Sequence, residues 1–160
     1  MSVVGAAAGR TILGWREWLA LPDLGILRIK AKLDTGARSS ALHVDVIEEF
    51  ARADGDWLRF QIEPLRRLPR SSPRRWIQAR LHDRREVRDS AGVVSLRPFI
   101  LTSVLIGERC LPIEINLTSR RGMLFPMLLG RTAMAGCIVV DPARSFVLGD
   151  RRPKPARKMP

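Results

Sequence analysis

The stretch Leu27-Arg28-Ile29-Lys30-Ala31-Lys32-Leu33-Asp34 carries the clearest structural signal in the sequence. Its odd positions are apolar and the even positions before Asp34 are cationic, a period of two that is typical of a strand with one buried face. Thr35 and Gly36 follow at once, and an aspartate before a small hydroxyl residue and a glycine favours a tight turn. The stretch therefore predicts a strand that ends by placing a carboxylate in a turn.

Further short apolar segments separated by turn residues predict more strands. Residues 15–21 are expected to form a hairpin with 27–33 through Pro22-Asp23-Leu24-Gly25. The other predicted strands cover 41–50, 57–62, 76–81, 99–106, 111–117, 124–129, 138–140 and 145–148. A helix over 40–50 is the alternative to the first of these, and a short helix is expected over 132–135. Many short strands at turn spacing predict an all-β barrel or sandwich.

The length of 160 residues predicts one domain, expected over 11–149, between a leader at 1–10 and a tail at 150–160. The net charge of +12 is local: residues 66–85 hold eight arginines and one aspartate, and residues 151–160 hold five cations. These two segments contribute +7 and +5, so the rest of the chain is neutral. Such segments attract anionic partners such as RNA, ribosomes or acidic peptides, although a solvated arginine-rich surface is the plain alternative.

Cysteine content and hydropathy bear on location. Two cysteines, Cys110 and Cys137, are too few for a disulfide framework or a four-cysteine metal site. No apolar run approaches the roughly 20 residues that span a bilayer. We therefore expect a cytoplasmic protein that does not enter a membrane.

Two segments of the chain resemble the retropepsin-like aspartic peptidases. Ala31-Lys32-Leu33-Asp34-Thr35-Gly36-Ala37-Arg38-Ser39-Ser40 matches their catalytic turn, and Leu128-Leu129-Gly130-Arg131 matches the apolar pair and Gly-Arg that pack beneath it. Together with Leu13-Gly14-Trp15-Arg16-Glu17-Trp18, Arg97-Pro98-Phe99-Ile100 and Phe125-Pro126-Met127, they resemble a bacterial family described as retropepsin-like aspartic endopeptidase and often labelled an ATP-dependent zinc protease. The resemblance implies a single-lobe acid-protease β-barrel with one short helix after the Gly-Arg motif.

The zinc and ATP of that label find no support in the residues. The sequence contains no His-Glu-x-x-His, its only histidines are His43 and His82, and it has no phosphate-binding loop. We therefore expect neither metal nor cofactor, and a zinc-dependent hydrolase is the third interpretation.

An aspartic peptidase needs two carboxylates that share one proton and activate water. The chain has one Asp-Thr-Gly, so the mechanism requires a homodimer in which each subunit contributes Asp34. By resemblance, Thr35 braces the two active-site turns and Gly36 lets backbone approach the carboxylates. Leu128, Leu129, Gly130 and Arg131 are expected to support the site.

The resemblance also implies a flap over the cleft. Our candidate is the hairpin 84–96, with Ser90-Ala91-Gly92 at its tip contacting substrate, and the arginine-rich loop at 65–75 is the alternative. Ala37 and Arg38 are the other expected substrate contacts. Many viral retropepsins have an acid at the position of Arg38 that pairs with the arginine of the Gly-Arg motif, which is Arg131 here.

Two guanidinium groups brought together repel unless an anion lies between them. One hypothesis is that this anion is an acidic side chain of the substrate. The alternative is that Glu17, Asp23 or another internal acid pairs with Arg131 while Arg38 points to water.

The leading functional interpretation is a homodimeric endopeptidase acting on peptide or isopeptide bonds of an acidic substrate. The family tends to accompany an ATP-grasp ligase that adds glutamate to a ribosomal protein, so the resemblance suggests a ligase or the ribosome as partner. The alternative is a non-catalytic basic module that presents residues 66–85 and the tail to RNA or the ribosome.

Overall fold

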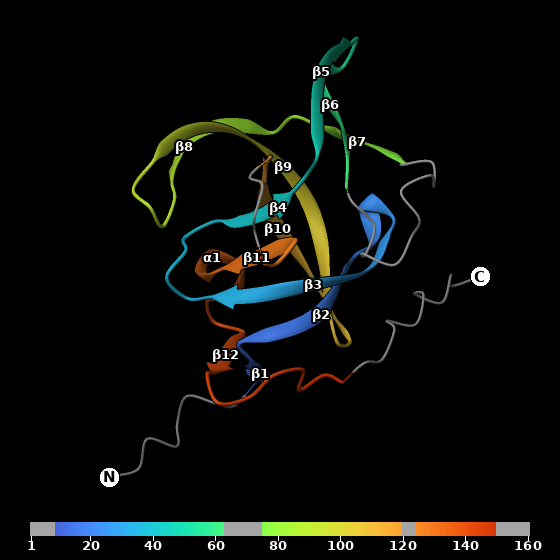
Figure 1. The fold of residues 1–160 in the computed structure, drawn as a ribbon. Coiled ribbons are helices and arrows are strands. Elements are labelled where there is room, and N and C mark those ends of the chain that lie inside the picture. Colours follow the sequence, from blue (N-terminus) through green and yellow to red (C-terminus); the bar gives the residue numbers. More distant parts are fainter. Residues whose placement is uncertain (1–8, 63–74, 120–123, 150–160) are drawn as a thin grey trace, which may run out of the picture.

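The computed structural model describes residues 9–62, 75–119 and 124–149 (Figure 1). The main sheet contains β2 (Arg16–Leu21), β3 (Ile26–Asp34), β4 (Ser40–His43), β8 (Asp83–Arg88), β9 (Val94–Ile106), β10 (Arg109–Thr118) and β11 (Met127–Gly130). The smaller sheets contain β1 (Thr11–Gly14) with β12 (Ile138–Asp141), and β5 (Val46–Arg52) with β6 (Gly55–Gln61) and β7 (Trp76–Arg80). One short α-helix, α1 (Arg131–Met134), follows β11, which confirms the predicted all-β class with a short helix after the Gly-Arg motif.

The main sheet curls back on itself. Its strand order is β10-β4-β11-β3-β2-β9-β8, and β9 also pairs with β10, so six of its strands form a continuous circuit around the core. Fully buried side chains fill the interior, among them Leu19, Leu42, Ile100, Ile115 and Leu129. Burial of apolar surface at this scale is what stabilises a small β domain.

The predicted β2–β3 hairpin is confirmed. Ile29, Ala31 and Leu33 of β3 are buried, and the cationic side chains between them are half-exposed, as the period of two predicts. The connection is a 3-10 turn, Pro22–Leu24, that ends at Gly25 with φ +69°, a conformation that glycine adopts at little cost.

The central neighbour of β3 comes from far along the chain. β11 lies between β3 and β4, parallel to β3 and antiparallel to β4, so that Gly130 stands beside Asp34. The predicted strand over 124–129 is therefore real but begins at Met127, because Leu124 is 88% exposed and does not enter the sheet.

The helix considered over residues 40–50 is not formed. The chain makes two strands there, β4 and β5, and β5 forms the predicted hairpin with β6. The strand expected over 76–81 is β7, which completes this smaller sheet. The hairpin expected from 99–106 and 111–117 is also confirmed, as β9 and β10.

The strand predicted over 145–148 is wrong. Residues 145–148 are irregular, Phe146 has φ +52°, and two amides of the segment, those of Val147 and Leu148, donate to the buried Glu17 carboxylate. A side chain has thus taken the hydrogen bonds that a strand partner would have made. β12 instead pairs in parallel with β1, a strand from the opposite end of the sequence.

Three expected segments lie wholly or largely outside the described residues. They are the leader, apart from residues 9 and 10, the loop at 65–75, apart from residue 75, and the whole tail at 150–160.

Candidate active site

The Asp34 carboxylate stands where β3 ends and the chain turns. The Gly36 N–H donates to Asp34 Oδ1 at 3.0 Å, and the Ala37 N–H donates to the Asp34 backbone oxygen at 3.3 Å. The second carboxylate oxygen, Oδ2, lies 3.5 Å from Nζ of Lys32, and the Asp34 side chain is 26% exposed. The turn thus fixes one oxygen of the carboxylate and leaves the group accessible to a ligand.

Gly130 supports this turn from behind. Its N–H donates to Ser40 Oγ at 3.0 Å, and a Cβ at this position would lie only 2.5 Å from the backbone carbon of Ser39 and 2.8 Å from the backbone oxygen of Arg38. Only glycine allows two backbone segments to approach so closely. Of the apolar pair before it, Leu129 is buried and Leu128 is half-buried.

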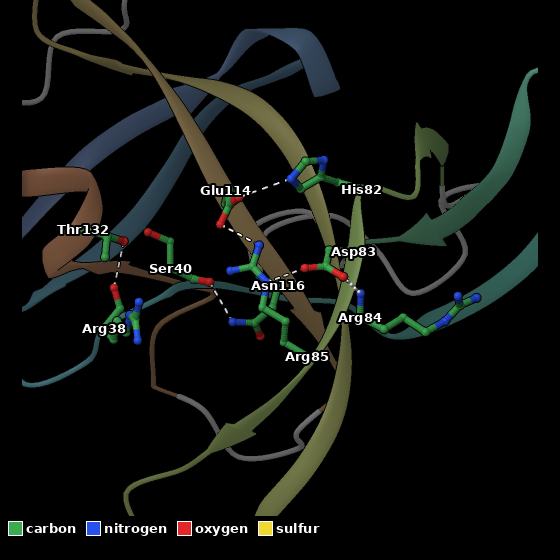
Figure 2. A network of polar contacts seen from close by, with 9 residues as sticks. All are labelled: Arg38, Ser40, His82, Asp83, Arg84, Arg85, Glu114, Asn116 and Thr132. Atoms are coloured by element: carbon green, nitrogen blue, oxygen red, sulfur yellow. Dashed lines mark hydrogen bonds and ion pairs between the residues drawn. The ribbon is translucent and has the colours of Figure 1, made fainter.

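The start of α1 holds the far side of the turn. The Arg131 N–H donates to Ala37 O at 2.8 Å, and both the N–H and Oγ1 of Thr132 donate to Arg38 O, at 3.2 and 2.8 Å (Figure 2). The Arg131 side chain also reaches the turn, because its Nη1 donates to Gly36 O at 3.3 Å. The structure therefore brings together the two segments that sequence reasoning placed in one site.

The two acids named as internal partners of Arg131 are engaged elsewhere. Asp23 Oδ2 accepts from the Ser103 N–H at 2.9 Å, and the Glu17 carboxylate accepts from three backbone N–H groups, so neither acid pairs with Arg131. Arg38 is exposed, and within the described residues its guanidinium makes no ion pair. An exposed cation beside the Asp34 turn can therefore receive an external anion.

A buried chain of polar side chains lies under the turn, and sequence reasoning missed it. Arg97 of β9, only 8% exposed, donates from Nη1 to Asn116 Oδ1 at 3.2 Å, and Asn116 Nδ2 donates to Ser40 O at 2.8 Å. Arg97 Nε also donates to Ser95 Oγ at 3.0 Å. The only signals were the Arg-Pro-Phe motif that contains Arg97 and the polar Asn116 in an otherwise apolar run.

The segment expected to be the flap is a hairpin. β8 and β9 pair antiparallel, and Figure 1 shows them arching out from the body on the side where β3 ends. Ser90, Ala91 and Gly92 are exposed at the tip, which Asp89 holds by accepting N–H bonds from Ala91 and Val93 at 2.8 and 3.0 Å. The Asp34 bonds described above, to Gly36, Ala37 and Lys32, do not involve this tip.

An ionic cluster fixes the base of this hairpin (Figure 2). Arg85 of β8 bonds to Asp83 Oδ2 and to Glu114 Oε2 of β10, each at 2.7 Å, and His82 Nε2 lies 3.2 Å from Glu114 Oε1. The hydrogen bond from Arg85 lowers the pKa of Glu114 below its usual value, and Arg85 likewise lowers the pKa of Asp83. The same two carboxylates raise the pKa of Arg85.

A cavity of about 360 Å³ opens beside the turn. It is lined by Thr35, Arg131, Thr132, Met134, Ala135, Ile138 and Val140. Most of its wall is aliphatic, yet it reaches the residue next to Asp34. Among the described residues, no three histidine, cysteine or acidic side chains gather as metal ligands would. The part of the chain that the structure describes also has no helix long and apolar enough to cross a membrane.

Comparison with known proteins agrees with this geometry. The family model of the RimB-like retropepsin-like aspartic endopeptidases matches residues 12–151. The chain belongs to this family. The RimB-like chain is also 40% identical, over 89% of its length, to a "Probable alpha-L-glutamate ligase" of Parasynechococcus marenigrum, and 36% identical over 88% to one of Shewanella halifaxensis. It spans only 30% of the length of these relatives.

A solved structure shares the fold. The crystal structure of a Legionella pneumophila protein of unknown function matches the RimB-like chain with a TM-score of 0.68 and 30% identity. The match covers 86% of this chain and 97% of the other.

Proposed function

We propose that this RimB-like chain is an aspartic endopeptidase that works as a homodimer. The observation that carries the proposal is the Asp34 carboxylate, held by the Gly36 N–H at a strand end, supported by Gly130 and Arg131, and open to solvent. A buried glycine and an arginine both support the turn that carries this one partly exposed carboxylate, and such support is typical of a functional group whose position matters.

The chemistry requires a second carboxylate, which the second subunit supplies. Two Asp34 carboxylates about 3 Å apart cannot both ionise, so the pair holds one proton. The ionised member takes a proton from water, and the oxygen of that water attacks the scissile carbonyl carbon. The protonated member donates to the carbonyl oxygen. On collapse of the tetrahedral intermediate, the C–N bond breaks, the carboxyl that took the proton from water gives it to the leaving nitrogen, and a hydroxyl of the intermediate returns a proton to the other carboxylate.

The surface beside Asp34 suits an association of two copies. Thr35 lines a cavity whose other walls are largely aliphatic, and a second subunit related by a two-fold axis that passes between the two Asp34 carboxylates would cover it. In an isologous interface the same patch is buried on both subunits, so each subunit would contribute its own copy of this cavity to the contact.

We further propose that the substrate is acidic. The exposed Arg38 has no carboxylate partner among the described residues and flanks the turn of Asp34. The relatives that match this chain over part of their length are named glutamate ligases, which also favours an acidic substrate. We therefore propose a peptide that carries glutamate residues as substrate and a ligase as functional partner. The basic segments at 66–85 and 151–160 could add to this attraction or bind the ribosome. Residues 66–74 and 151–160 lie outside the described residues, whereas Arg84 and Arg85 of the first segment pair with acids of the domain.

Asp34→Asn tests the mechanism. The variant should lose peptidase activity by at least about a thousandfold, because an amide can neither share the proton nor act as base. Asp54→Asn, an equal change of charge at the β5–β6 turn, should leave activity unchanged. Unfolding curves and sedimentation of both variants show whether fold and dimer survive, and activity retained in a folded Asp34→Asn dimer would rule out the mechanism.

Mixed dimers test the sharing of the site. Wild-type and Asp34→Asn chains exchanged in equal amounts should leave about a quarter of the dimers with two aspartates. Activity per total chain should then be about a quarter of wild type, whereas a monomeric catalyst would retain about half.

Arg38→Ala tests the substrate class. The variant should raise KM for a glutamate-rich peptide about tenfold, the value of one charge-assisted hydrogen bond, and leave the KM of a neutral peptide unchanged. Equal changes for both peptides would remove the preference for acidic substrates without touching the role of Asp34.

A further inference from the structure

The small sheet of β5, β6 and β7 has one face against the core and one face in solvent. Leu58 and Phe60 of β6 are fully buried on the inner face. The alternate residues Trp57, Arg59 and Gln61 therefore lie on the outer face. Figure 1 shows the β5–β6 hairpin rising away from the curled main sheet. On the outer face the side chains are exposed or half-buried, and Arg52, Arg59 and Trp76 are among the exposed ones.

The register of the three strands gathers aromatic, cationic and amide side chains on that outer face. Phe50 pairs with Trp57, which pairs with Arg80, while Glu48 pairs with Arg59, which pairs with Gln78. The full set of this aromatic–arginine face is Val46, Glu48, Phe50, Arg52, Gly55, Trp57, Arg59, Gln61, Trp76, Gln78 and Arg80. It holds three aromatic rings and three arginines against one glutamate.

Guanidinium groups lie over the aromatic rings of this face. The Arg52 guanidinium carbon lies 4.1 Å from the centroid of the Trp57 ring and 5.2 Å from that of Phe50. That of Arg59 lies 4.8 Å from the centroid of Trp76, whose surface is 40% exposed. The planes are also held in place, because Trp57 Nε1 donates to Asp54 Oδ1 at 2.8 Å and Arg52 donates to Gln78. Planar groups fixed in this way lose little conformational entropy when a ligand stacks on them.

We propose that this aromatic–arginine face binds single-stranded RNA. Unpaired bases stack on aromatic rings and on guanidinium planes, and the phosphates between them are attracted by arginine. The charge of the face fits an anion: Glu48 is engaged by Arg59, and Asp54 at the edge is engaged by the Trp57 indole. An acidic peptide would satisfy the cations but would leave the rings unused.

Two amides favour RNA over DNA. Gln61 and Gln78 lie among the rings on the same face, and an amide can donate to and accept from a ribose 2′-hydroxyl, a group that DNA lacks. Asp34 is not part of the face, so this binding neither requires nor reports the peptidase activity proposed above.

The test is titration of a fluorescein-labelled, unstructured ten-nucleotide RNA with the full chain, followed by anisotropy. Trp76→Ala and Trp57→Ala should each weaken binding about tenfold, the effect of losing one stacked base. Arg52→Gln should weaken binding and reduce the salt slope by about one, whereas Arg144→Gln, the same loss of charge outside the face, should change the affinity less than twofold. Asp34→Asn should bind as wild type does.

Indole N–H resonances give a second readout that needs no variant on the face. RNA should shift the signals of Trp57 and Trp76 and leave those of Trp15 and Trp18 in place. RNA binding that is unaffected by both tryptophan variants, or that leaves the Trp57 and Trp76 signals unmoved, would overturn the proposal. Equal affinity for a ten-residue glutamate peptide would overturn it in favour of an acidic peptide, and equal affinity for the same sequence as DNA would remove the preference for RNA.

Discussion

The turn after β3 and the tip of the β8–β9 hairpin are built in opposite ways. The turn at 34–40 is held by groups distant in sequence, because β11 and α1 bond to it from about ninety residues away and Asn116 bonds to it from β10. At the tip, 89–93, the bonds from Ala91, Gly92 and Val93 to Asp89 and from Asp89 to Val93 all join residues at most four apart in sequence. We therefore expect local opening to cost more free energy at the Asp34 turn than at the hairpin tip.

The largest difference is expected from glycine-to-alanine substitutions in the two regions. Gly130→Ala should lower the free energy of unfolding by about 3 kcal/mol or more, because its Cβ would lie 2.5 Å from the backbone of Ser39. Gly92→Ala, at φ +83° with nothing within 4 Å, should cost only about 1 kcal/mol. Urea unfolding of both variants measures the difference, and equal costs would mean that the turn is not tightly packed.

Asn116→Ala should have the next largest effect. It leaves the buried guanidinium of Arg97 and the backbone oxygen of Ser40 each short of one bond, which costs about 1–3 kcal/mol of unfolding free energy. Hydrogen exchange of the Gly130 amide, whose N–H donates to Ser40 Oγ, should also become faster in this variant. Asn116→Asp, which keeps an acceptor for Arg97 but loses the donor to Ser40, separates the two bonds.

Asp89→Ala should affect the tip and little else. The amides of Ala91 and Val93 lose their acceptor, so their hydrogen exchange should accelerate while the free energy of unfolding falls by less than about 1 kcal/mol. Accelerated exchange at residues 34–40 in the same variant would contradict the independence of the two regions.

The smallest effect concerns pH and the base of the hairpin. Because Arg85 lowers the pKa of Glu114 from its usual 4.5, the bond stabilises the fold above that value and is lost as pH falls through the lower, folded value. Glu114→Gln should thus be less stable than wild type at about pH 7 by under about 1 kcal/mol, and this difference in stability should shrink as the pH falls below 4.5. A difference in stability that grows as the pH falls would mean that the bond between Arg85 and Glu114 does not stabilise the fold.

Local patterns predicted local structure well. The period of two in residues 27–33 indicated both the β2–β3 hairpin and the position of Asp34, and the turn residues of 53–56 indicated the β5–β6 hairpin. Both depend on neighbours in sequence, where propensity and alternation act directly. The joining of the Asp34 turn to Gly130 was available only through the family resemblance, since no local pattern specifies a partner about ninety residues away.

Hydrogen bonds between buried polar side chains and the backbone could not be predicted from the sequence. Residues 145–148 have the composition of a strand, yet Glu17 takes two of their amides, and nothing in the sequence marks Glu17 as buried. The Arg97–Asn116 contact was missed for the same reason, because buried polar pairs follow no period. Such groups are recognised only once the fold has brought their partners together.

The position of β11 has a consequence for how the protein is made. Residues 127–130 complete the sheet between two strands synthesised much earlier, β3 and β4, so the Asp34 turn lacks its support until most of the domain has been translated. Pairings this distant in sequence are slow to form and leave strand edges exposed meanwhile. A nascent chain therefore carries the Asp-Thr-Gly sequence through the synthesis of β4 to β10 before β11 can support the turn.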